Sequence, residues 1–296
     1  MVDVLCVGHA SYDLIFTVPH HPAADEKTFA DAFLACGGGP AANAAVTVAR
    51  LGYGAAFAGY LGTDLYGATH LEELQREGVA TDLVVRGDSP TPISVILVKP
   101  DGQRTLVNYK GQTRHLASDE LDFSAVAARA ILFDGHEPLI SPSWADLARA
   151  NRVPTVLDAG SLHGGTEALM GRVDYLVCSE KFAGQWLGKN HPREALDRLS
   201  GIAPVVVITL GERGAIWRRA AEKGHAPAPP IVAVDTTGAG DAFHGAFAAG
   251  IAAGLEWTAI LDLASAAGGL CCTKLGARPG IPSAAQVASL MGRLAS

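Results

Sequence analysis

One acidic residue in this sequence coincides with a possible anion-binding site. The segment 234–243 reads VDTTGAGDAF, in which Asp241 follows the small residues Gly238, Ala239 and Gly240. Small residues let backbone N–H groups approach an anion, and a helix predicted from Ala239 to Gly254 adds the positive end of its dipole. The carboxylate can therefore accept a proton from a hydroxyl while the amides stabilise a transferring phosphoryl group. The alternative is a plain Gly-rich turn with an acidic first-turn residue.

The composition narrows the class of partner. The 296-residue chain is 49% hydrophobic and 18% charged, with a net charge of −7, as is typical of a well-packed soluble enzyme. Nucleic acids and anionic membranes require a basic face, so we expect neither as a partner. Five cysteines without CxxC spacing predict buried free thiols. The N-terminus has no basic segment followed by a long apolar one, which predicts a cytoplasmic location.

The order of the apolar runs predicts an α/β fold, with a mainly parallel sheet covered by helices on both faces. Predicted strands at 4–7, 55–60, 131–133, 155–157, 175–178 and 204–210 alternate with helical segments over much of the chain. We predict a loop at 223–229 and a strand at 230–234. A single domain is expected over residues 1–296.

A smaller sheet is expected beside the main one. Segments 92–99 and 104–109 are rich in β-formers and are joined by a Pro-Asp-Gly turn, and 27–35 alternates like a strand. We therefore predict a lid of about four short strands from segments near 12–36 and 91–110. An apolar lid face is costly to leave exposed, so we expect a homodimer formed through the lid.

The glycine cluster that begins at Gly37 has two interpretations. Gly37, Gly39 and Ala42 fit the loose dinucleotide fingerprint, with Asp64 at the expected distance. That fingerprint belongs after the first strand, however, whereas the turn there is Gly8-His9-Ala10. The other interpretation is a backbone floor for a polyol, with Asn43 as donor and acceptor. A nicotinamide-dependent oxidoreductase therefore remains an alternative function.

Three motifs, in this order, resemble the ribokinase-like (PfkB) carbohydrate kinases. GGPAAN at 38–43 is similar to the N-terminal di-glycine motif of the family, TLG at 209–211 to its nucleotide-side turn, and DTTGAGD at 235–241 to its C-terminal motif. The resemblance runs from Val4 to Pro282. It implies a ribokinase-like α/β fold with a small β lid. It also implies transfer of the ATP γ-phosphoryl group to a sugar hydroxyl, with Mg²⁺ bridging the nucleotide phosphates.

The resemblance further implies roles for individual residues. Asp241 matches the catalytic base, and the anion hole matches Gly238, Ala239 and Gly240. Sugar-contacting positions match Asp13, Gly38, Gly39 and Asn43. Nucleotide contacts match Thr209, Gly211 and Gly214, and a monovalent-cation site for K⁺ is similar to Asp235 with Gly276 and Ala277.

Two departures from the family pattern concern the Mg²⁺ site and the identity of the sugar. The stretch 179–182 reads SEKF where many members carry Asn-x-x-Glu near Mg²⁺, so Glu180 is out of register. Pro40 stands where ribokinases carry Lys, which weakens a ribose assignment. Segments 37–42 and 278–282, together with His244, look most like the sulfofructose kinase branch, which implies an anionic sugar.

That branch resemblance adds further candidate substrate contacts. Lys27 and Asn108 match it, whereas His136 falls where Arg is expected. Arg104 and Glu137 are also candidates. For Lys27 and Arg104 the alternative is a solvated charge at the lid edge, and for Glu137 an acid at a helix start.

We therefore predict an ATP-dependent sugar kinase that uses Asp241 as its base. A third hypothesis is a non-catalytic sugar sensor on the same fold, which Asp241 beside an intact glycine run disfavours because a sensor needs no base. His244, one turn inside the helix, is predicted to be a packed helix residue rather than a proton shuttle.

Overall fold

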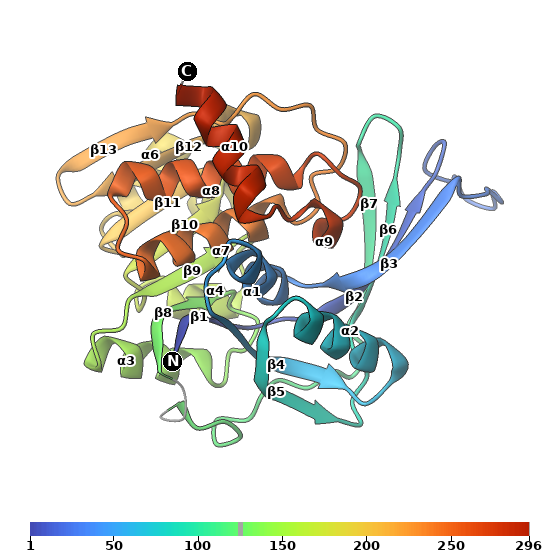
Figure 1. Cartoon of the computed structure of the whole chain (residues 1–296), viewed down its shortest axis with the longest axis horizontal. Coiled ribbons are helices and arrows are strands. Elements are labelled where there is room, and N and C mark those ends of the chain that lie inside the picture. Colours follow the sequence, from blue (N-terminus) through green and yellow to red (C-terminus); the bar gives the residue numbers. More distant parts are fainter. Residues whose placement is uncertain (124–126, 296) are drawn as a thin grey trace.

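A nine-stranded sheet forms the centre of the protein (Figure 1), as described by a computed structural model for residues 1–123 and 127–295. The strand order is β13-β12-β11-β10-β9-β8-β1-β4-β5, and only β12 and β13 run antiparallel to their neighbours. The strands are β1 (Val2–Val7), β4 (Ala55–Gly62), β5 (Ala80–Gly87), β8 (Ala128–Phe133), β9 (Thr155–Ala159), β10 (Tyr175–Ser179), β11 (Val205–Thr209), β12 (Ala215–Arg219) and β13 (Glu222–Ala226).

Helices cover both faces of this sheet because its strands are apolar on both sides. Val4 and Cys6 of β1 point into one core, which contains α1 (Pro40–Arg50), α7 (Ala239–Ala252), α8 (Trp257–Cys271) and α10 (Ala284–Ala295). Leu5 and Val7 point into the other core, which contains α3 (Ser141–Ala150), α4 (Gly164–Leu169), α5 (Glu180–Leu187) and α6 (Pro192–Leu199). Two-sided burial is the usual state of a parallel sheet.

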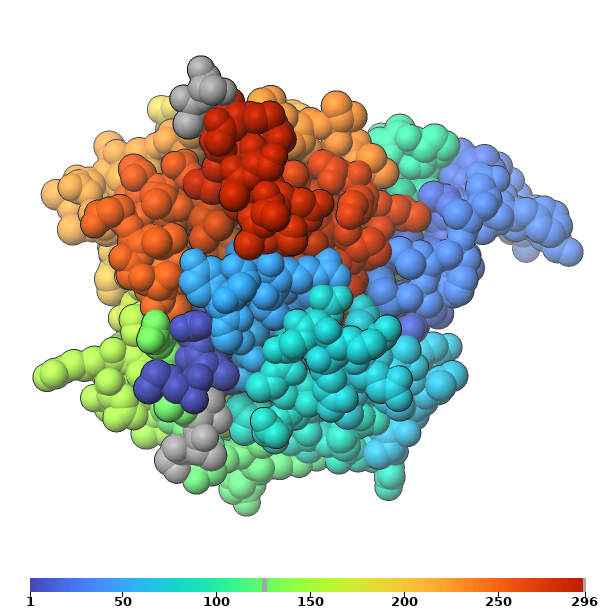
Figure 2. Space-filling model, in the orientation of Figure 1, coloured from blue at the N-terminus to red at the C-terminus, as the bar shows by residue number. Residues whose placement is uncertain are grey.

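A separate four-stranded sheet projects from the side of this body, as the blue and green arm in Figures 1 and 2 shows. Its order is β3-β2-β6-β7, built from β2 (Ser11–Thr17), β3 (Ala32–Gly38), β6 (Ile93–Val98) and β7 (Arg104–Tyr109). The register places Asp13, Ser94 and Asn108 in one row across three strands. Side chains alternate between the two faces of a strand, so this row lies on one face of the sheet.

The predicted fold class is confirmed, but three local predictions are wrong. The strand predicted at 27–35 begins at Ala32 and continues through Gly38, because the glycines pair with Ser11 and Tyr12 of β2. Residues 222–226, predicted largely as loop, form β13, which pairs with β12 across a tight turn at Ala220 (φ 51°). No strand forms at 230–234; the N–H groups of Val234 and Asp235 instead donate to the carbonyl of Cys272.

The thiol prediction is also confirmed: all five cysteines are free and buried. Within the described residues, no helix combines the length and the apolar character needed to cross a membrane.

Asp64 holds the start of α2 (Leu65–Arg76) in place and also fixes the segment before β6. Its carboxylate accepts hydrogen bonds from Gly67 N at 2.8 Å, Thr91 N at 2.7 Å and Thr91 Oγ1 at 2.8 Å. Although burial opposes them, these bonds lower the pKa of Asp64. The acid therefore serves as a helix cap, which leaves it poorly suited to bind the ribose of a dinucleotide.

We expect Asp64→Ala to lower the free energy of unfolding by about 1–2 kcal/mol, the usual cost of losing an N-cap acceptor. Urea unfolding followed by circular dichroism measures this change. Asp64→Asn keeps one oxygen acceptor for Gly67 N but sets its NH2 group against Thr91 N–H, so it is expected to recover only part of the stability. Equal stability of Asp64→Ala and the parent would contradict the capping role.

Candidate active site

Two cavities meet at the start of α7. The first, about 550 Å³, is lined there by Thr236, Ala239 and Gly240. The second, about 250 Å³, is lined there by Thr237 and Asp241. One helix N-terminus therefore contributes to both cavities, and its dipole and N–H groups favour a negative charge at this point.

The turn that leads into α7 requires residues without bulk. Gly238 has a φ of 76°, and a Cβ built there would lie 2.4 Å from the Cβ of Ala277. The buried carboxylate of Asp235 locks the turn by accepting bonds from Thr237 N at 2.9 Å, Thr237 Oγ1 at 2.7 Å and Gly276 N at 2.8 Å. The predicted cation-site residues 235, 276 and 277 are thus brought together beside the turn that leads into α7.

Asp241 is held by a chain of polar contacts. It accepts from Asn43 Nδ2 at 2.8 Å, and Asn43 Oδ1 accepts from Arg278 at 3.2 Å. Arg278 is buried and forms an ion pair with Glu73 at 3.3 Å. Glu73 in turn accepts from Gly37 N at 2.7 Å. Burial raises the pKa of Asp241, against the bond from Asn43 and the charge of the nearby imidazole ring.

The second cavity has polar groups suited to hydroxyls. The row of Asp13, Ser94 and Asn108 lines it, together with Gly39 and Asn43. Burial raises the pKa of Asp13 to about 6, although hydroxyls of Ser11 and Ser94 donate to it. Gly38 lies directly beside Asp13, since a Cβ built there would be 2.2 Å from its carboxylate.

Two histidines and a lysine also line this cavity, and burial lowers the pKa of one of them, His9, well below its ordinary value. His9, Lys110 and His136 line both this cavity and a smaller adjoining one, and no hydrogen bond or ion pair forms from their side chains within the described residues. The rings of His9 and His136 lie 5.2 Å apart. Glu137 lines only the adjoining cavity, where it accepts from Leu116 N at 2.7 Å, and burial raises its pKa to about 7.

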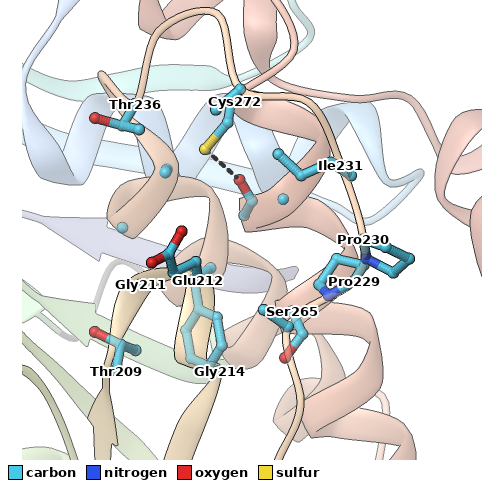
Figure 3. Close-up of a pocket in the computed structure, with 17 residues that line it drawn as sticks. Thr209, Gly211, Glu212, Gly214, Pro229, Pro230, Ile231, Thr236, Ser265 and Cys272 are labelled. Carbon is cyan, nitrogen blue, oxygen red and sulfur yellow. Dashed lines mark hydrogen bonds between the residues drawn. The ribbon is translucent and has the colours of Figure 1, made fainter. Parts of the chain in front are cut away.

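The first cavity is a largely apolar slot (Figure 3). Thr209, Gly211 and Glu212 lie on one side of it, at the end of β11 and in the short helix η2 (Gly211–Arg213), and the segment 229–231 lies opposite. Gly214, with a φ of 81°, packs its Cα against the backbone of 226–228, where a Cβ would clash at 2.1 Å. All three predicted nucleotide contacts therefore line this slot.

One predicted substrate contact, Lys27, and the out-of-register acid Glu180 lie apart from these two cavities. Lys27 is exposed in the loop between β2 and β3, with its ammonium 5.7 Å from the ring of Phe29. Glu180 forms an ion pair with Arg213 on the surface. Arg104 does reach the site, because its guanidinium donates to Thr237 Oγ1 at 2.8 Å and lies 3.6 Å from Asp235.

The residues that sequence reasoning missed are Arg278, Thr237, His9 and Lys110. Arg278 lies in the segment 278–282, which the sequence linked only to a branch of the family. Its ion pair with Glu73 could not be predicted, because the two residues are 205 positions apart in the chain. Thr237 lies inside the motif at 235–241, so this motif could have indicated that Thr237 is part of the site. His9 follows the first strand, which is where open α/β sheets bind ligands.

Comparison with known proteins identifies the family. The model of the pfkB family of carbohydrate kinases matches residues 1–284. The chain belongs to this family. It is 27% identical to a ribokinase of Bacillus subtilis over 98% of this chain and 100% of that protein. Its fold matches a ribokinase of Thermotoga maritima with a TM-score of 0.87 at 26% identity, covering 99% of this chain and 100% of the other.

A structure of Arabidopsis thaliana ribokinase complexed with ribose and ATP is also similar, with a TM-score of 0.85, 27% identity and 98% coverage of both chains. The predicted membership of the PfkB family is thus confirmed. These three relatives are ribokinases, so the likeness to the sulfofructose kinase branch remains a prediction.

The dinucleotide alternative has no support from the geometry of this kinase. Gly37 and Gly38 lie in β3 of the small sheet rather than after β1, and Asp64 is committed to Gly67 and Thr91. The glycine cluster instead forms the floor beside Asp13.

Proposed function

We propose that the protein transfers the γ-phosphoryl group of ATP to a hydroxyl of a sugar, with Asp241 as the base. The observation that carries this proposal is the meeting of the two cavities at the start of α7. The larger cavity is within the usual range for a bound small molecule and suits a nucleotide, and the smaller one suits a sugar. The reacting groups would then meet beside Gly240 and Asp241.

The residues around the two cavities supply the requirements of phosphoryl transfer. The carboxylate of Asp241 takes the proton of the attacking hydroxyl, and the N–H groups of 238–240 stabilise charge on the phosphoryl oxygens. Asp13 and Asn108 orient the sugar from the small sheet. A loose transition state needs positioning and charge stabilisation above all, and this arrangement offers both.

Mg²⁺ and K⁺ are part of the proposal. Among residues 1–123 and 127–295, no three His, Cys, Asp or Glu side chains gather to hold a metal. A magnesium ion would therefore take most of its ligands from nucleotide phosphates and water, as Mg²⁺ often does. For K⁺, Asp235 supplies a buried carboxylate beside Gly276, and its two oxygens already accept three protein hydrogen bonds.

We expect Asp241→Asn to lower kcat by about 10²–10⁴-fold, the usual contribution of a general base, with sugar affinity within a few-fold. An ADP-release assay measures turnover, and calorimetric titration measures sugar binding. Asp262→Asn, an exposed acid of α8, is the matched control and is expected to leave both unchanged. Full turnover by Asp241→Asn would overturn the role of the base. If the substitution changes sugar binding and no turnover is lost, the protein would instead be a sugar sensor.

The sugar is proposed to carry an anionic substituent. Lys110 brings a positive charge to the sugar cavity in a protein of net charge −7, and it lies there beside His136 and the buried ring of His9, whose pKa burial lowers well below its ordinary value. The side chains of these three residues have no acidic partner among the described residues. The contact of a hydroxyl with Asp241 and of an anionic group with Lys110 would together fix the orientation of the sugar.

A screen of neutral, acidic and phosphorylated sugars tests this proposal, with and without K⁺. We expect the highest kcat/KM for an anionic sugar. Lys110→Met should then raise its KM by about 10–100-fold, because a bond to a charged group is lost, and should change the KM of a neutral sugar little. A preference for a neutral sugar, unaffected by this substitution, would contradict the proposal.

We also propose that two copies associate through the outer face of the small sheet. Phe33 and Val107, from the two edge strands, are 59% and 63% exposed and lie on the face opposite Asp13 and Asn108. Phe16 packs on Phe33 at 4.9 Å and extends this apolar surface. Exposed apolar faces of small sheets are typical interaction sites.

We expect light scattering to give the mass of a dimer for the parent chain and of a monomer for Val107→Glu, because a buried charge opposes association. Leu65→Glu, at an exposed apolar residue of α2, is the control and should remain dimeric. A monomeric parent, or a dimeric Val107→Glu, would refute this interface.

A further inference from the structure

The two ring nitrogens of a buried histidine, one helix turn after the proposed base, face oxygen atoms. His244 is 2% exposed and lies one turn after Asp241 on α7. Its Nδ1 is 2.6 Å from the carbonyl oxygen of Gly240, and its Nε2 is 3.1 Å from the carbonyl oxygen of Val177. Nδ1 also lies 3.3 Å from a carboxylate oxygen of Asp158.

The chemistry of these neighbours fixes the protons on the ring. A carbonyl oxygen can only accept, so each ring nitrogen must donate. A neutral imidazole has one N–H and would leave a lone pair pointing at a carbonyl lone pair. We propose that His244 is a buried imidazolium, with a proton on each nitrogen, and that its positive charge acts as a positioning cation for the carboxylate of Asp241.

A second buried histidine shows the opposite arrangement. His70, fully buried on α2, has its Nε2 3.3 Å from the guanidinium of Arg278, which can only donate. Burial and this cation lower the pKa of His70, which is therefore neutral. The two rings share a buried setting and differ in the charge of their neighbours, so burial alone does not decide the protonation of His244.

The charge balance around Asp241 calls for a cation. Carboxylates approach it from three other elements: Asp13 of β2, Asp134 after β8 and Asp158 at the end of β9. Arg104 of β7 lies opposite but is partly exposed. Like charges disfavour the ionised form of a buried acid. A cation between Asp158 and Asp241 offsets this repulsion and keeps the base able to accept a proton.

The stability of α7 does not explain why a charged His244 ring lies at this position. A positive charge near a helix N-terminus opposes the helix dipole. Asp158 has no hydrogen bond at its second carboxylate oxygen, which is the one that faces His244. The contact between Asp158 and His244 is therefore an ion pair without a hydrogen bond; burial raises the pKa of Asp158, and the charge of the ring lowers it.

Nitrogen NMR of the uniformly ¹⁵N-labelled protein tests the protonation directly. We expect one of the ten histidines to keep both ring nitrogens protonated above pH 8, where exposed histidines are neutral, and this signal to vanish in His244→Gln. Absence of any such imidazolium in the parent protein overturns the proposal. This readout needs no turnover, so it is separate from failure of the proposed kinase activity.

The pH profile tests the effect on the base, which rests on the proposed function. His244→Gln removes the cation, so the acidic limb of kcat/KM should move to higher pH by about one unit. Phe247→Leu, one turn further along α7 and fully buried, is the control for lost packing. It should lower stability and leave the limb in place. A limb that stays in place in His244→Gln overturns the positioning role.

Discussion

The structure depends on keeping Gly240, in the first turn of α7, exposed while the carboxylate of Asp241 lies next to it in the chain. Helix N-termini attract anions through these amides, and an acid in the first turn competes for the same field. Here Asp241 is turned toward Asn43 instead, at 2.8 Å, while Gly240 remains exposed. The exposed amide and the carboxylate are thus kept apart, which explains why small residues precede the acid.

The rest of the fold holds this helix end in place. Gly238 can approach Ala277 only because neither carries bulk, and Asp235 ties the turn to Gly276. The contacts from Asn43 to Arg278 and on to Glu73 then connect α7 with α1, α9 (Ala277–Gly280) and α2. The small sheet joins the same network through Gly37. One chain of contacts thus links α1, α9, α2 and the small sheet to the carboxylate of Asp241.

The motifs made the fold class and the position of the first turn predictable. Small residues before an acid carry their physical reason in the sequence itself. The end of β3 was not predictable, because Gly37 and Gly38 are poor strand formers that join β2 only through long-range pairing. Arg278 was missed for a related reason. An isolated arginine gives no sign that it will be buried against Glu73, since the pair is formed by tertiary packing.

The protonation of His244 cannot be predicted from the sequence pattern. Its spacing on an apolar helix predicts a packed residue, and the ring is indeed packed. Only the identities of the facing atoms, two carbonyl oxygens and a carboxylate, separate a neutral ring from a charged one. Those atoms come from α7, β9 and β10, so no local window contains them. In an acidic protein that must accept an anion, the local positive charge therefore comes from backbone amides and a few placed cations rather than from composition.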